Sequence, residues 1–199
     1  KGPDDAWDPI ESATNAYFLV CGYYRMSSSS DWKPSGGFLQ MFSSAPANGF
    51  YISQPDPLII TQISGGLRAV RQRALGSFDQ LNLTPTSAHY NKMCQVAYWR
   101  NSEGQGFRMK SVDGEVSTAA SVGVENSVDY SGIRPTWGDA REPANGPYST
   151  EDAKASNFRS YRGRLEDLSV SGRDPLTVLN ADWDRVQARI TASGNTIFV

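Results

Sequence analysis

The side chains most suited to catalysis are one histidine, His89, and two cysteines, Cys21 and Cys94. A Ser-His-Asp or Cys-His mechanism would have to use His89, because the chain has no other histidine. Cys94 follows closely enough that strand alternation would place it on the opposite face from His89. These three residues also fall short of the usual ligand set of a zinc site. We therefore interpret His89 as a loop or strand-edge residue without a catalytic role, and we expect no metal and no cofactor.

The two cysteines also bear on the fold. Two cysteines in 199 residues are too few for a disulfide scaffold, so we favour two buried thiols over a disulfide. Trp32 lies between them in sequence, which partly resembles the Cys-Trp-Cys pattern of immunoglobulin domains. The pattern is incomplete, because Lys92 stands where that family has a tyrosine. An Ig-like adhesion module remains an alternative that depends on a Cys21–Cys94 bond.

Paired carboxylates would suit glycoside hydrolysis, and the chain has 21 Asp and Glu residues from which a fold could form a pair. The densest acidic cluster is Asp4, Asp5 and Asp8, which we interpret as an exposed arm. No pair stands out in the sequence. A carbohydrate-active enzyme, or a carbohydrate-binding accessory module, therefore remains an alternative hypothesis.

Arginines form two basic clusters. The first contains Arg68, Arg71 and Arg73, and the second interleaves Arg159, Arg162 and Arg164 with Phe158 and Tyr161. Arginines beside aromatic residues are typical of single-stranded nucleic-acid binding. However, Glu166 and Asp167 follow the second cluster, and the formal net charge is −2. We favour a solvated helix face with internal ion pairs, and we do not expect a nucleic-acid partner.

Aromatic residues in polar loops are the best candidates for ligand contact. Trp32 follows a run of serines, and Trp137 lies in a loop that also contains Arg134 and Tyr148. Tryptophan offers a flat apolar face with a hydrogen-bonding edge, which suits sugars and protein partners. The alternative is that each tryptophan packs beneath its own loop. We predict Trp32, Arg134, Trp137 and Tyr148 as ligand-binding residues. The sequon at Asn82 is a weak glycosylation signal.

The elements that must position these residues are mostly strands. Aromatic and β-branched residues dominate 15–24, 38–42, 58–63 and 93–100, with turn signals between them. Asp113-Gly114 predicts a two-residue hairpin turn. That turn would pair Val112 with Glu115, Ser111 with Val116, Met109 with Thr118 and Phe107 with Ala120. One face then carries Phe107, Met109, Val116 and Ala120 and the other carries charge, as a half-buried sheet requires.

Helical periodicity occurs mainly towards the C-terminus. Residues 67–78 carry apolar side chains at helical spacing, which predicts a short helix, and Phe158, Tyr161, Leu165 and Leu168 predict a second one. The strongest helix lies over 175–191, because Asp174-Pro175 form an N-cap and N1 pair and Gly194 is placed to end it. We divide the chain into an N-terminal arm, 1–14, and one β-rich domain, 15–199. That domain contains a long loop, 131–148, and a more helical part, 149–193.

These observations predict a mainly β, antiparallel sandwich or jelly-roll-like domain with one to three short helices. No apolar run approaches the about 20 residues of a membrane span. With no catalytic constellation evident, we interpret the chain as a non-enzymatic binding or assembly domain cut from a larger protein. We favour an outward-facing viral coat or spike domain, at a virion surface or otherwise extracellular. Its expected partners are copies of itself and a glycan or protein receptor.

Overall fold

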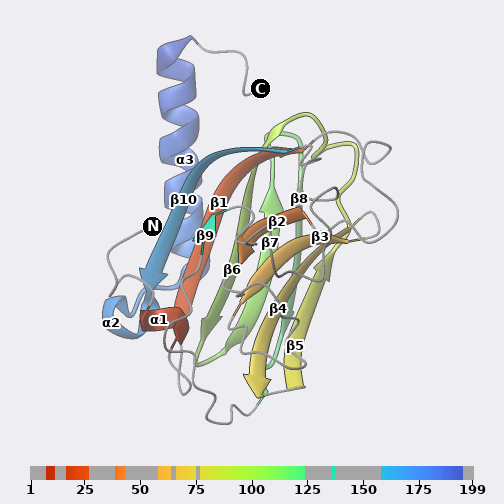
Figure 1. The fold of residues 1–199 in the computed structure, drawn as a ribbon. Coiled ribbons are helices and arrows are strands. Elements are labelled where there is room, and N and C mark those ends of the chain that lie inside the picture. Colours follow the sequence, from red (N-terminus) through yellow and green to blue (C-terminus); the bar gives the residue numbers. More distant parts are fainter. Residues whose placement is uncertain are drawn as a thin grey trace.

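The computed structural model of the chain contains two antiparallel sheets packed face to face, with a long helix on the outer face of one of them (Figure 1). It describes residues 8–11, 17–26, 39–43, 58–63, 66–74, 77–123, 136–137 and 158–194. The mainly β architecture with antiparallel sheets and a few helices is as the sequence predicts. No helix in these ranges is long and apolar enough to cross a membrane.

Sheet A contains five strands in the order β10-β1-β6-β7-β8. Their bounds are β1 Phe18–Met26, β6 Met93–Asn101, β7 Gly104–Lys110, β8 Glu115–Ala120 and β10 Phe158–Asp167. Sheet B contains five strands in the order β5-β4-β3-β2-β9. Their bounds are β2 Leu39–Ser43, β3 Ile59–Ile63, β4 Gly66–Ala74, β5 Ser77–Leu83 and β9 Thr136–Trp137. Every strand pair in both sheets is antiparallel.

The main core lies between the two sheets. Sheet A contributes Phe18, Val20, Val96, Phe107 and Met109 among others, and sheet B contributes Ile60, Leu67, Ala69, Leu81 and Leu83. The short helix α1, Asp8–Glu11, adds the fully buried Ile10 from the predicted N-terminal arm. Burial of this apolar surface is the main force that holds the sheets together.

A second core lies on the other face of sheet A, beneath α3, Pro175–Ser193. Leu19, Cys21, Tyr23, Met93 and Ala97 come from the sheet, and Val178, Leu179 and Trp183 come from the helix. The Trp183 and Tyr23 rings stack with centroids 6.3 Å apart. Strand β1 is therefore buried on both faces, which explains why Phe18 to Tyr24 form one buried run.

The capping signals of α3 act as the sequence predicts. The Asp174 carboxylate accepts a hydrogen bond from the Thr177 amide at 2.7 Å, Pro175 occupies the first turn, and Gly194 ends the helix with φ 63°. The buried residues are all in the first half, up to Trp183. The second half extends past the strands of sheet A in Figure 1.

The β7–β8 hairpin forms, but its register differs from the predicted one. Ser111 N–H donates to the Gly114 carbonyl at 2.8 Å, and Met109 pairs with Val116. Val112 and Asp113 therefore make the turn, one residue before the predicted Asp113-Gly114, and the partner of each strand residue shifts by two positions. Because side chains alternate with a period of two, this shift leaves every residue on its predicted face.

Two predicted helices are strands. Residues 67–74 lie in β4 and residues 77–78 begin β5, and Leu67 and Ala69 of β4 face the core on alternate positions. Residues 158–167 form β10, an edge strand of sheet A, and only Leu168–Ser171 turn into the short helix α2. In both cases pairing with a neighbouring strand outweighs a weak local helical pattern. The predicted part 149–193 thus contains β10 before its two helices.

Replacing Trp183 with alanine tests whether α3 depends on the second core. Trp183→Ala removes a side chain that is 6% exposed and stacked on Tyr23. We expect the free energy of unfolding to fall by about 3–5 kcal/mol, measured by urea denaturation. Arg189→Ala, at an exposed site on the same helix, is the control and should change it by less than about 0.5 kcal/mol. Equal effects of the two variants would contradict the role of Trp183.

Candidate functional site

The predicted ligand-binding residues fall mostly in parts that the structure does not describe. Trp32, Arg134 and Tyr148 lie outside the described residues. Trp137 lies in β9, where it pairs with Phe42 of β2. Strand β9 ends sheet B, so the predicted loop 131–148 is joined to the edge of the sandwich at Thr136–Trp137.

The ends of the two sheets define two sides of the sandwich. Strand β5 at one end of sheet B lies against β7 and β8 of sheet A. The strands at the opposite ends of the two sheets, β9 and β10, are therefore both on the other side of the sandwich (Figure 1). We call this the β9–β10 side.

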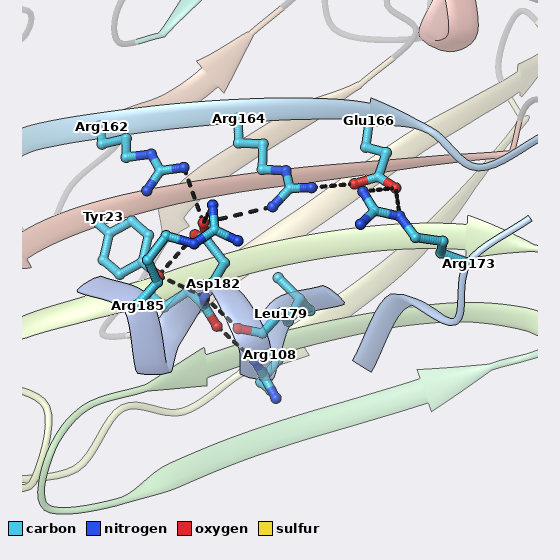
Figure 2. A network of polar contacts seen from close by, with 10 residues as sticks. Tyr23, Arg108, Arg162, Arg164, Glu166, Arg173, Leu179, Asp182 and Arg185 are labelled. Carbon is cyan, nitrogen blue, oxygen red and sulfur yellow. Dashed lines mark hydrogen bonds and ion pairs between the residues drawn. The ribbon is translucent and has the colours of Figure 1, made fainter. Parts of the chain in front are cut away.

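A polar network joins β10 and α3 on this side, and Asp182 is at its centre (Figure 2). The Asp182 side chain is 1% exposed. Its Oδ2 accepts from the Tyr23 hydroxyl at 3.0 Å, and its Oδ1 accepts from Arg162 Nη2 at 2.9 Å. Arg164 Nη1 and Arg185 Nη1 lie 3.6 Å and 4.0 Å from the same Oδ1. A buried carboxylate is thereby compensated by a hydroxyl and several guanidiniums.

The network continues inward beneath α3. Gln95 Nε2 donates to the Tyr23 hydroxyl at 2.9 Å and to the Leu179 carbonyl at 3.0 Å. Arg108 donates to Gln95 Oε1 at 2.6 Å and to Asn180 Oδ1 at 2.8 Å. Burial lowers the pKa of the Arg108 guanidinium. Arg108, on the face of the β7–β8 hairpin that the sequence marks as charged, therefore meets a helix, while Glu115 on the same face stays exposed.

A second carboxylate extends the network along β10. Glu166 Oε2 accepts from Arg164 Nη2 at 2.5 Å, and Glu166 Oε1 accepts from Arg173 Nε at 2.7 Å. Although burial opposes the shift, bonds to Arg173 and Ser171 and the charge of Arg164 hold the pKa of Glu166 below its usual value. The ion pairs predicted for the second arginine cluster thus exist. Its arginines lie on strand β10 instead of a helix, however, and Arg162 and Arg164 both pair with Asp182 of α3. Asp167 instead caps α2 through the Ser169 amide at 2.8 Å.

The nucleophile candidates are used in packing. Cys21 and Cys94 are both buried free thiols, and burial raises the pKa of each to about 12. Cys21 faces α3 and Cys94 faces the space between the sheets. These positions bear out the free thiols and exclude the Ig-like form that required a Cys21–Cys94 bond.

His89 lies in the turn between β5 and β6 and is 2% exposed. Its Nδ1 accepts from the Thr86 amide at 3.1 Å, and its carbonyl accepts from the Cys94 thiol at 3.2 Å. The same turn holds the β7–β8 hairpin, because Ser111 Oγ donates to the Ala88 carbonyl at 2.6 Å. Within the described residues no group of three or more His, Cys, Asp or Glu side chains could hold a metal.

Comparisons with known proteins leave the family open. No family model and no curated protein matches the chain. Among solved structures, the botulinum neurotoxin serotype C1 binding domain is 14% identical with TM-score 0.36, covering 61% of this chain and 26% of that one. The botulinum neurotoxin DC binding domain in complex with SialylT is 15% identical with TM-score 0.39, covering 59% and 27%. The same domain with rat synaptotagmin II is 16% identical with TM-score 0.38, covering 65% and 28%.

This chain spans only about a quarter of the length of these solved structures. TM-scores at this level carry no assignment of function to this chain. The candidate site therefore depends on the geometry described above.

The pH dependence of stability tests the His89 turn. Desolvation lowers the pKa of His89 from 6.5, so the native state holds it neutral. As the pH falls below 6.5, the unfolded chain binds a proton that the native chain does not, so the free energy of unfolding decreases until the pH passes the lowered native pKa.

We expect urea midpoints measured between about pH 7 and about pH 5 to fall more steeply in the wild type than in His89→Gln. Burial and the charge of Lys92, which pairs with Asp113, disfavour the charged ring, and together they outweigh the hydrogen bond with Thr86, which acts to raise the pKa of His89. Identical slopes for the two proteins would contradict this account of His89.

Proposed function

We propose that the chain is a non-enzymatic binding domain that contacts a glycan or a protein receptor through its β9–β10 side. The observation that carries this proposal is the place of Trp137 in the terminal strand of sheet B. The aromatic loop predicted from sequence is attached there to a scaffold with two packed cores. Binding residues are commonly carried by loops that a rigid scaffold positions.

The chemistry of the described residues supports binding over catalysis. A retaining or inverting glycosidase needs one carboxylic acid with a raised pKa. Asp182 and Glu166 share Arg164, yet the pKa of Glu166 is lowered, which is the opposite of what a general acid requires. We therefore rank a carbohydrate-active enzyme below a binding domain. The parent protein that we favour is an outward-facing viral coat or spike, because the sequence combines β-rich, serine- and glycine-rich segments with long decorated loops.

Removing the loop tryptophans tests the binding proposal. We expect Trp137→Ala and Trp32→Ala each to reduce binding on a glycan array by about tenfold or more, since stacking on a sugar ring is lost. Val112→Ala trims a 42% exposed side chain at the hairpin turn, on the other side of the sandwich, and should bind as the wild type does. Unchanged binding by both tryptophan variants would remove their assignment.

The proposed viral coat or spike parent predicts that the chain forms a defined oligomer. We expect light scattering or native mass measurement to give a closed dimer or trimer, because coat and spike domains assemble with closed symmetry. The expected mass is a small multiple of 21.8 kDa. A monomer at all concentrations would instead favour an accessory module.

A further inference from the structure

Three guanidiniums converge on one oxygen of one carboxylate at the seam between β10 and α3 (Figure 2). Arg162, Arg164 and Arg185 lie 2.9, 3.6 and 4.0 Å from Asp182 Oδ1. The other carboxylate oxygen accepts the Tyr23 hydroxyl at 3.0 Å. Asp182 alone therefore compensates only part of the positive charge gathered around it.

The neighbouring carboxylate does not remove this excess. Glu166 pairs with Arg164, but it also accepts from Arg173, which adds a further cation. Four guanidiniums thus face two carboxylates along the seam. Like charges held this close repel one another, and an added anion would relieve that repulsion.

Two of the arginines can reach a ligand from solvent. The Arg162 side chain is 35% exposed and the Arg185 side chain is 53% exposed, while the carboxylate that holds them is buried. A guanidinium has five N–H donors. Among the described residues, the polar contact of Arg162 is with Asp182 through Nη2, which leaves its other donors for a ligand. Guanidiniums bind carboxylates and sulfates in a bidentate manner.

An exposed aromatic residue, Tyr161, directly precedes Arg162 in β10. The β1–β10 pairing is irregular between Tyr23, which pairs with Arg162, and Tyr24, which pairs with Ser160. Tyr161 is the extra residue of this β-bulge, and it is 37% exposed. Bulges commonly redirect a side chain at a sheet edge. An exposed aromatic residue adjacent in the strand to an exposed arginine suits a ligand that has both a sugar face and an anionic group.

We propose that the seam formed by Tyr161, Arg162, Arg164 and Arg185 binds the anionic group of a glycan, either a carboxylate, as in a sialylated glycan, or a sulfate ester. This inference rests on the proposed binding function and specifies the ligand for the β9–β10 side. A protein partner fits less well, because interface cores are apolar. Among the described residues the exposed large hydrophobic side chains are Val112, Tyr161, Val170 and Leu176, of which only Tyr161 is adjacent in sequence to an arginine of the seam.

Titration calorimetry with sialyllactose, a heparin-derived hexasaccharide, lactose and polyglutamate tests the proposal. We expect sialyllactose or the hexasaccharide to bind at least about tenfold more tightly than lactose, with affinity that falls as salt is raised. Arg185→Gln and Tyr161→Ala should each weaken binding of the anionic sugar by about tenfold. Comparison of the two anionic sugars separates carboxylate from sulfate recognition.

Arg68→Gln is the matched control, because Arg68 lies on sheet B and donates to Asn82 at 3.1 Å instead of joining the seam. It should leave binding unchanged. Arg185→Gln removes the most distant of the three cations, so it tests the site even if Arg162→Gln prevents folding.

Equal losses in Arg185→Gln and Arg68→Gln, or equal affinity for lactose and both anionic sugars, would overturn the inference. Tight binding of polyglutamate alone would assign the seam to acidic peptides instead. Binding of neutral glycans that depends on Trp137 but not on Arg185 would overturn this inference and leave the proposed function standing. Failure of all four probes to bind, together with no binding on the glycan array, would count against both the seam as a binding site and the proposed function.

Discussion

The arrangement of the outer layer depends on compensating one buried carboxylate. Asp182 lies on α3 with 1% of its side chain exposed, and a charge in that position is stable only when partners surround it. Tyr23 from β1 and Arg162 and Arg164 from β10 supply those partners. Because the partners come from two strands, the helix is held in one position across them. Hydrophobic contacts alone would bury the same apolar area, but they would fix the position of α3 across the strands less precisely, because they are not directional.

This helix changes the character of sheet A. Without it, β1, β6 and β7 would have one face in solvent, and Gln95 and Arg108 would be ordinary surface residues. With α3 in place, both are buried and bonded to one another at 2.6 Å. No described helix packs on the outer face of sheet B as α3 does on that of sheet A. The outer faces of the two sheets therefore present different surfaces to a partner. The exposed part of the polar network lies along the seam between β10 and α3, where its guanidiniums outnumber its carboxylates.

Local sequence signals were reliable where a few adjacent residues decide the structure. The caps of α3 and the position of the β7–β8 hairpin depend on such residues, and both are present as predicted apart from the hairpin register. Helical spacing over 67–78 and 158–168 is misleading, because pairing with other strands determines those segments. The partners of β4 are its hairpin neighbours β3 and β5, and the partner of β10 is the distant strand β1. The predicted loop site is only partly located, since Trp137 alone lies in a described element. The arginines of β10 were noticed in the sequence, but Asp182, which organises them, carried no signal there.

The sequence by itself therefore determined the class of the fold and the identity of its best helix, and it favoured unpaired thiols over a disulfide. Each of these follows from composition or from contacts between near neighbours along the chain. Tertiary structure alone decided which charged residues meet. Tyr23, Arg162 and Asp182 are separated by up to 159 positions and share one hydrogen-bonded centre. The energy of such a centre depends on burial and on distances between side chains, and neither quantity exists until the strands and α3 have packed.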